Sequence, residues 1–123
     1  MGIGSDLWKQ YETLTNNRDW AGATSLFTTD AVYDSPGGRH EGSEAIAAFY
    51  QRLANAGEAN PGAFDTTMET SLVIEDGNTV AAEFTVRAGA TDVGSVAVST
   101  VKDGKFATMH VYYDSVALSK LFA

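Results

Sequence analysis

The period of the hydrophobic pattern changes near residue 60, and this change constrains the fold more than any other feature of the sequence. Up to Leu53, apolar residues recur at the spacing of helices, whereas beyond the loop Gly57–Ala63 they alternate with polar residues, as they do in strands. Helices followed by a meander of strands predict an α+β domain, in which a cone-shaped, curved antiparallel sheet has about three helices packed on its concave side. Such a bent, covered sheet leaves a conical cavity of the kind that binds small molecules.

Three helices are expected in the first half of the chain. Ser5 can cap a helix of about three turns that ends at Asn16-Asn17, and Asp19 can cap a shorter helix that runs to Phe27. Ser43 starts the third helix. The second half contains four expected strands, with a tight hairpin at Lys102-Asp103-Gly104 between the last two: Phe64–Ile74, Thr79–Arg87, Val93–Val101 and Lys105–Tyr113.

The composition is that of one acidic domain covering residues 1–123. The chain has 16 acidic and 8 basic residues and a formal net charge of −8. A phosphate backbone or an anionic membrane would repel such a chain, so we expect neither nucleic acid nor a membrane as a partner. No apolar run approaches the roughly 20 residues that a membrane helix needs. Cysteine is absent, which excludes disulfides and thiolate metal sites but leaves the compartment open, because a cysteine-free chain folds anywhere. An acidic balance is common in cytoplasmic proteins, and we expect a cytoplasmic location.

Five polar residues gather at the end of a short strand in the stretch Asp30–Phe49. Val32 and Tyr33 suit a strand, and Pro36-Gly37-Gly38 interrupts it. We expect a loop here that carries Asp34, Ser35, Arg39, His40 and Glu41. Binding and catalytic residues concentrate on such loops, so this segment is the first place to look for chemistry.

Three of these residues are candidate catalytic groups. Asp34 and Ser35 sit at the junction of strand and loop, where they either contact a ligand or satisfy the backbone of a turn. In an ideal strand the two side chains point to opposite faces, and a β-bulge would exchange them. His40 is either a solvated loop histidine or, because imidazole titrates near neutral pH, a general base if the loop folds inward.

Three stretches of the chain resemble one known superfamily: Tyr11–Pro36, GSEAIAAFYQRL at Gly42–Leu53 and GKFATMHVYYDSV at Gly104–Val116. They are similar to the first helices and strand, the third helix and the last strand of the bacterial ketosteroid isomerases and SnoaL-like polyketide cyclases, members of the nuclear-transport-factor-like superfamily. The resemblance covers nearly the whole chain. It implies an α+β cone whose apolar pocket supports acid–base chemistry on a hydrophobic, carbonyl-bearing small molecule.

The resemblance also implies roles for single residues. Ketosteroid isomerases use an aspartate base and an oxyanion hole made of a tyrosine and a protonated aspartic acid. Tyr11 matches the position of that tyrosine, and Ser35 occupies the position of the base. The second oxyanion donor would lie near Ala97 or Ser99, where the chain has no carboxylic acid. SnoaL-like cyclases place a carboxylate on the last strand, at a position that matches Val111.

The later strands supply the expected pocket wall. If Met109 and Val111 face the pocket, alternation places His110 on the opposite face of the sheet. Thr85 and Arg87 would share that outer face, a mixed polar surface that often forms the dimer interface in this superfamily, so we expect a homodimer. The expected ligand-binding wall consists of Phe84, Val86, Met109, Val111 and Tyr113.

Three functions are compatible with the sequence. The first is an isomerase or cyclase in which Tyr11 donates to a developing oxyanion and Asp34 or His40 acts as the base. The second is a non-catalytic binder of a hydrophobic small molecule in the same pocket. The third is an interaction domain that dimerises through the open sheet face and whose pocket is filled. The two histidines lack metal-ligand spacing, so we expect no metal, and we expect no cofactor.

Overall fold

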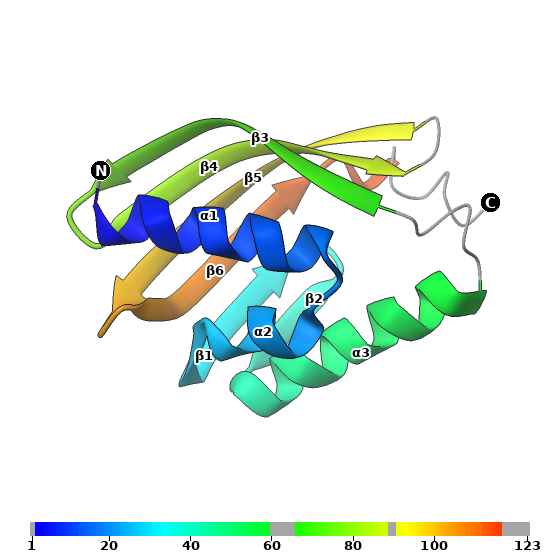
Figure 1. Ribbon diagram of the computed structural model, residues 1–123, viewed down its shortest axis with the longest axis horizontal. Helices are drawn as coiled ribbons and strands as arrows, with labels where there is room; N and C mark the ends of the chain where they lie inside the picture. The colour runs from blue at the N-terminus through cyan, green and yellow to red at the C-terminus, as the bar shows by residue number, and fades with distance from the viewer. Residues whose placement is uncertain (1, 60–65, 89–90, 117–123) are drawn as a thin grey trace.

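The computed structural model describes residues 2–59, 66–88 and 91–116. Within them the chain forms three helices and six strands (Figure 1). In chain order these are α1 (Ile3–Asn16), α2 (Trp20–Ser25), β1 (Phe27–Ser35), β2 (Gly38–Glu41), α3 (Ser43–Ala59), β3 (Thr66–Asp76), β4 (Thr79–Ala88), β5 (Thr91–Lys102) and β6 (Lys105–Tyr113). The first two residues of the expected strand Phe64–Ile74 lie outside the described residues. In the described part of the chain, no helix is both long and apolar enough to span a membrane.

The strands form one curved, unclosed sheet in the order β2-β1-β6-β5-β4-β3. The three helices lie together on one side of it (Figure 1), which confirms the predicted α+β architecture. Neighbouring strands are antiparallel except β1 and β6, which are parallel, so the sheet is mixed rather than wholly antiparallel as predicted. Alternation identifies strands but not their partners, and therefore could not reveal that β1 lies beside the last strand.

Interruptions of strand pairing accompany the curvature of the sheet. The register shifts between Thr70 and Leu72 where β3 pairs with β4, and between Thr100 and Val101 where β5 pairs with β6. An extra residue in one strand of an antiparallel pair bends that strand and increases its twist. The sheet therefore curves toward the helices instead of lying flat beneath them.

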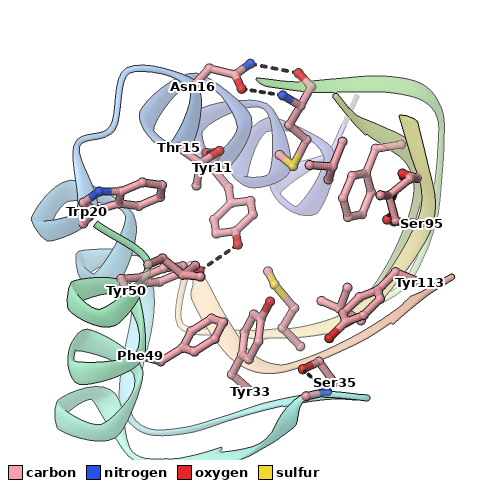
Figure 2. A pocket seen from close by; sticks show the side chains of 18 of the residues that line it. Tyr11, Thr15, Asn16, Trp20, Tyr33, Ser35, Phe49, Tyr50, Ser95 and Tyr113 are labelled. Atoms are coloured by element: carbon pink, nitrogen blue, oxygen red, sulfur yellow. Dashed lines mark hydrogen bonds between the residues drawn. The ribbon is translucent and has the colours of Figure 1, made fainter. Parts of the chain in front are cut away.

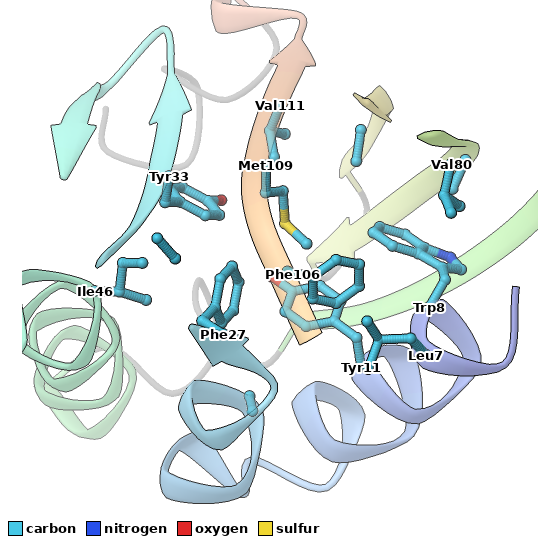
Figure 3. Close-up of a cluster of buried hydrophobic side chains, with 14 of the residues drawn as sticks. Leu7, Trp8, Tyr11, Phe27, Tyr33, Ile46, Val80, Phe106, Met109 and Val111 are labelled. Carbon is cyan, nitrogen blue, oxygen red and sulfur yellow. The ribbon is translucent and has the colours of Figure 1, made fainter. Parts of the chain in front are cut away.

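An aromatic cluster fixes α1 against the sheet (Figure 3). The ring centroid of Tyr11 lies 5.2 Å from that of Trp8, 5.9 Å from that of Phe106 and 6.2 Å from that of Phe27. Full burial of a large apolar side chain stabilises a fold by about 1.5–3 kcal/mol. The indole N–H of Trp8 also donates to the Thr70 hydroxyl at 2.9 Å, which fixes the helix in register with β3.

The starts of the first two helices test the predicted caps. Asp19 caps α2, because its Oδ1 accepts from the backbone N–H of Gly22 at 2.9 Å. Ser5 does not cap α1, which begins earlier, at Ile3. Instead, the backbone N–H and the hydroxyl of Ser5 each donate to Oε1 of Glu75 at 2.7 Å. The prediction was wrong because the hydroxyl of Ser5 hydrogen-bonds to a carboxylate on β3, which is distant in sequence.

The polar loop predicted after Ser35 is instead a β-hairpin. β2 pairs antiparallel with β1, so that Asp34 lies opposite Arg39 and Tyr33 lies opposite His40. The prediction was wrong because β2 is a short strand at the edge of the sheet. Its polar residues carry no hydrophobic alternation by which a strand could be recognised.

The contact between Ser5 and Glu75 predicts an acid-sensitive contribution to stability. Hydrogen bonds from the hydroxyl and the backbone N–H of Ser5 hold the pKa of Glu75 below its ordinary value of 4.5. Because the folded-state pKa is depressed, this contribution is complete above about pH 4.5 and is lost as the pH falls through the folded-state value. Glu75→Gln should therefore lower the free energy of unfolding near neutral pH and flatten its decline in acid. Urea unfolding at about pH 7 and about pH 3.5 measures both effects, and parallel pH profiles of the two proteins would contradict the prediction.

Candidate functional site

A cavity of about 450 Å³ lies between the helices and the concave face of the sheet (Figure 2). All three helices and every strand except β2 contribute to its lining. The helices provide Trp8, Tyr11, Thr15, Asn16, Trp20, Phe49, Tyr50 and Leu53. The cavity is therefore built by the whole fold and not by one loop.

The sheet side of the cavity contains all five residues expected to form an apolar wall. They alternate along β4 and β6, so that each strand presents every second side chain to the concave face. These residues are Phe84, Val86, Met109, Val111 and Tyr113. Alternation alone was sufficient to place them.

Apart from Tyr11, the aromatic residues on the helical side of the cavity were not predicted to line it. The rings of Trp20 and Tyr50 are stacked, with centroids 5.5 Å apart and planes at 13°. Phe49 lies beside them and packs against Tyr33 of β1 at 5.1 Å between ring centroids. The spacing of Phe49 and Tyr50 on α3 indicated an inward face. Which inward residues reach a cavity depends on how α2 and α3 pack together, and that cannot be read from spacing.

Tyr11 and Tyr50 form a buried hydrogen-bonded pair in the lining. Their hydroxyl oxygens are 2.7 Å apart, and either can be the donor. Burial raises the pKa of Tyr11 to about 12 and raises the pKa of Tyr50 well above its ordinary value. Both hydroxyls are consequently protonated at neutral pH. One hydrogen is used between them, and the other can be donated to a third group.

The other polar lining groups mostly have partners in the protein. The side-chain amide of Asn16 donates to the backbone oxygen of Met68 at 2.8 Å and accepts from its N–H at 2.7 Å. The hydroxyl of Ser35 accepts from the backbone N–H of Gly37 at 3.2 Å, so Ser35 satisfies the turn between β1 and β2 while lining the cavity. Gly37 fits closely here, because an added Cβ would lie 3.0 Å from the hydroxyl of Tyr113.

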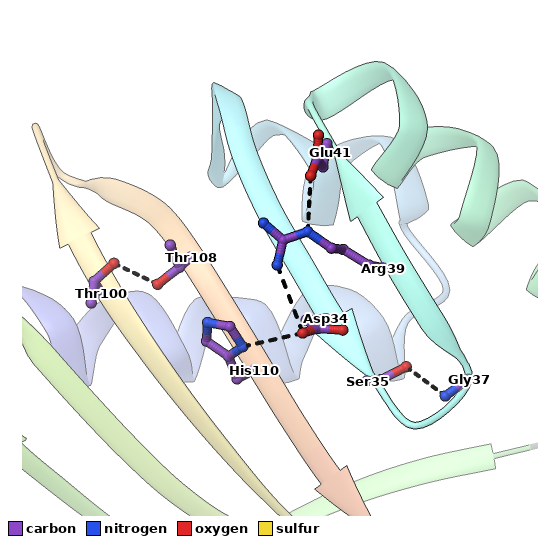
Figure 4. Close-up of polar contacts among 8 residues, drawn as sticks. All are labelled: Asp34, Ser35, Gly37, Arg39, Glu41, Thr100, Thr108 and His110. Atoms are coloured by element: carbon purple, nitrogen blue, oxygen red, sulfur yellow. Dashed lines mark hydrogen bonds and ion pairs between the residues drawn. The ribbon is translucent and has the colours of Figure 1, made fainter.

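Asp34 lies on the outer face of the sheet and does not line the cavity (Figure 4). Its Oδ2 is 3.9 Å from a guanidinium nitrogen of Arg39 and 3.7 Å from Nδ1 of His110. Pairing with β2 continues through Asp34 and Ser35 without a bulge, so alternation turns Ser35 inward and Asp34 outward. His110 accordingly lies on the outer face, as predicted.

His40 also lies outside the lining of the cavity. Its ring stacks on Phe49, with centroids 4.6 Å apart and planes at 26°. Partial burial and the nearby positive charge of Arg52 lower the pKa of His40. The imidazole is therefore a neutral support behind an aromatic wall residue, and neither of the two expected bases reaches the cavity.

The cavity is uncharged in the part of the chain that the structure describes. No Asp, Glu, His, Lys or Arg is among its lining residues. Across the same residues, no three His, Cys, Asp or Glu side chains are grouped so that they could hold a metal ion. What the cavity offers a ligand is apolar area and hydroxyl donors.

Comparison with known proteins identifies the family. The model of the SnoaL-like domain matches residues 8–109. This chain belongs to the SnoaL-like family. The SnoaL-like fold is shared with an NTF2-like protein of unknown function from Burkholderia pseudomallei K96243, with a TM-score of 0.84, 17% identity and 98% of each chain covered. No curated protein matches the sequence.

Two further solved structures share the SnoaL-like fold and bear out the resemblance seen in the sequence. A ketosteroid isomerase-like protein from Kribbella flavida has a TM-score of 0.74 and 22% identity, with 89% of this chain and 76% of that chain covered. A polyketide cyclase-like protein from Sinorhizobium meliloti has a TM-score of 0.71 and 23% identity, with 90% of this chain and 99% of that chain covered. At these identities the likeness establishes the fold.

The Tyr11–Tyr50 pair predicts a specific pattern of stability changes. Tyr11→Phe leaves the hydroxyl of Tyr50 without its partner and should lower the free energy of unfolding by about 1–3 kcal/mol. The double variant Tyr11→Phe/Tyr50→Phe removes both hydroxyls and should recover part of that loss, because no unpaired group is left. Urea unfolding of the four proteins completes a double-mutant cycle. Additive effects of the two single changes would contradict the prediction.

Proposed function

We propose that this SnoaL-like protein binds a neutral, hydrophobic small molecule that carries a carbonyl or phenol oxygen. The observation that carries the proposal is an uncharged, aromatic-walled cavity into which buried tyrosine hydroxyls project. We also infer a cytoplasmic location, for which the acidic composition is the support.

The size of the cavity supports binding over a purely structural role. Its volume of about 450 Å³ falls within the roughly 300–1,000 Å³ of small-molecule sites. An interaction domain with a filled interior would leave no such space. We therefore set aside the third function considered from the sequence.

The chemistry of the lining supports a neutral ligand with a hydrogen-bond acceptor. Apolar area supplies affinity, at about 25 cal/mol per Å² removed from water. A charged ligand would lose its hydration without gaining an opposite charge, which is costly in an apolar site. A carbonyl or phenol oxygen, in contrast, can accept the hydrogen that the Tyr11–Tyr50 pair has to spare.

A second candidate is an enzyme of the ketosteroid isomerase or polyketide cyclase type. The observation that favours it is the set of buried hydroxyls that burial keeps protonated, because such donors stabilise charge that develops on a carbonyl oxygen. The described lining contains no carboxylate or imidazole base, so water would have to accept the substrate's proton, as it can from an acidic 1,3-dicarbonyl compound. Deuterium exchange into such a compound, followed by NMR with and without the protein, separates the enzyme from the binder.

Tryptophan fluorescence provides a direct test of binding. The chain has two tryptophans, Trp8 and Trp20, and both line the cavity. A phenolic steroid should quench them saturably, whereas a carboxylate analogue of similar size should bind at least about tenfold more weakly. Val86→Phe, which fills cavity space, should weaken binding. Its matched control, Val98→Phe on β5, is outside the lining and should bind as the wild type does. Equal loss in both variants, or no saturable quenching, would overturn the proposal.

We also propose a homodimer through the outer face of the sheet. Leu72, Val96 and Tyr112 are 51%, 38% and 60% exposed. Strand register aligns them in one row across the outer face, with Glu83 between Leu72 and Val96. Exposed apolar side chains mixed with a charged one form the kind of surface that can pack against a second copy of itself.

The dimer proposal predicts that one charge in this row separates the subunits. Val96→Glu should give a monomer by light scattering at micromolar concentration, because like charges would face each other across a two-fold axis. Circular dichroism serves as the control for folding. A monomeric wild type at that concentration would contradict the proposal.

A further inference from the structure

Tyr33 carries a hydroxyl that the fold itself does not use. It lies on β1, is 7% exposed, and its ring packs among Phe27, Phe49 and Tyr50. Among the residues that the structure describes, no hydrogen bond joins the Tyr33 hydroxyl to another group. Its nearest tyrosine neighbours on the helices, Tyr11 and Tyr50, bond to each other.

A buried hydroxyl without a partner is unusual, because buried polar groups are nearly always hydrogen-bonded. The one side-chain polar atom in the described residues that is both fully enclosed and unpartnered is Oγ of Ser99. The Tyr33 oxygen is therefore not sealed in the core, and Tyr33 lines the cavity. Figure 2 shows its hydroxyl end directed inward, toward the region faced by the hydroxyls of Tyr11 and Tyr50.

We propose that the Tyr33 hydroxyl is a dedicated hydrogen-bond donor to a ligand oxygen, additional to the donor that the Tyr11–Tyr50 pair provides. The inference rests on the proposed function and deepens it, because it names the group that selects a phenol or carbonyl over the corresponding hydrocarbon. The resemblance to ketosteroid isomerases assigns no role to this residue.

The environment of Tyr33 maintains it as a donor. Burial raises its pKa well above the ordinary value, and the proximity of Tyr11 and of Tyr113 raises it further. The hydroxyl therefore keeps its proton at neutral pH. The packed ring holds the oxygen in place, so little conformational freedom is lost when a ligand binds.

The ring of Tyr33 packs in the core while its hydroxyl faces the cavity, and this distinguishes the hydroxyl from a structural one. The aromatic neighbours require only a ring, which a phenylalanine would also supply. Tyr113, on the neighbouring strand β6, also lines the cavity. It is only half-buried, so water outside the protein can hydrate its hydroxyl. The oxygen of Tyr33 opens to the cavity that Tyr33 lines, so a ligand that fills the cavity must hydrogen-bond to this hydroxyl or leave it unpaired.

The test compares a phenolic steroid with its 3-deoxy analogue in the full-length protein. Tyr33→Phe should weaken binding of the phenol by about tenfold or more, because the ligand oxygen loses a donor, and leave the affinity for the deoxy compound unchanged. The matched control is Tyr112→Phe, at an exposed tyrosine of the outer face, and should leave both affinities unchanged. If Tyr33→Phe binds the phenol as the wild type does, or loses both compounds equally, the inference is wrong while the proposed function stands.

Thermal unfolding tests, without any ligand, whether the hydroxyl of Tyr33 stabilises the fold. Since the hydroxyl has no partner among the residues that the structure describes, Tyr33→Phe should unfold at the same or a higher temperature than the wild type, whereas Tyr11→Phe should unfold at a lower one. A loss of stability in Tyr33→Phe as large as that in Tyr11→Phe would mean that the hydroxyl serves the fold, and would overturn the inference. If the wild type binds neither steroid, the proposed function fails. The melting temperatures still show whether the hydroxyl of Tyr33 stabilises the fold.

Discussion

The curvature of the sheet is the constraint on which the rest of this structure depends. Helices are stiff rods about 10 Å across, and three of them cannot follow a concave surface along its whole length. Where α1 reaches the sheet, Trp8, Tyr11 and Phe106 fill the gap and form the core. Where the sheet curves away, the same layer of side chains stops short of contact and encloses a cavity. Core and cavity are thus two parts of one interface, and they share Tyr11.

Alternation along the strands separates charge from the cavity. On β1, Tyr33 and Ser35 turn inward while Asp34 turns outward to Arg39 and His110. The same rule places His110 outside, between Met109 and Val111 on the inside. The cavity lining in the described residues is therefore uncharged and mostly apolar although the chain as a whole carries a charge of −8. A hydrogen bond from a hydroxyl in such apolar surroundings is electrostatically stronger than the same bond in water, so a hydroxyl there is an effective recognition element.

Residue patterns within short stretches of the sequence predicted some features of the structure correctly and could not predict others. Period-two strands predicted the wall residues, and the hairpin at Asp103 and Gly104 was predicted correctly, since both residues adopt the positive φ that its turn requires. Ser5 and Tyr33 could not be assigned in this way. The partner of Ser5 lies on β3, and the surroundings of Tyr33, which has no hydrogen-bond partner among the described residues, come from helices and strands remote in the chain. Neighbouring residues in the sequence carry no signal of that kind.

The parallel pairing of β1 and β6 also governs the order in which the molecule can assemble. Apart from the short edge strand β2, β6 is the strand beside which β1 lies, and among the described residues β6 is the last strand of the sheet to be synthesised. A nascent chain can form the helices and the β3–β5 meander, but β1 and α3 have no sheet to join until β6 emerges. Folding of such non-local topologies is slow and leaves apolar surface exposed in the meantime. The cavity, part of whose lining lies on β6, is thus complete only once β6 has joined the sheet, so ligand binding depends on this late step of assembly.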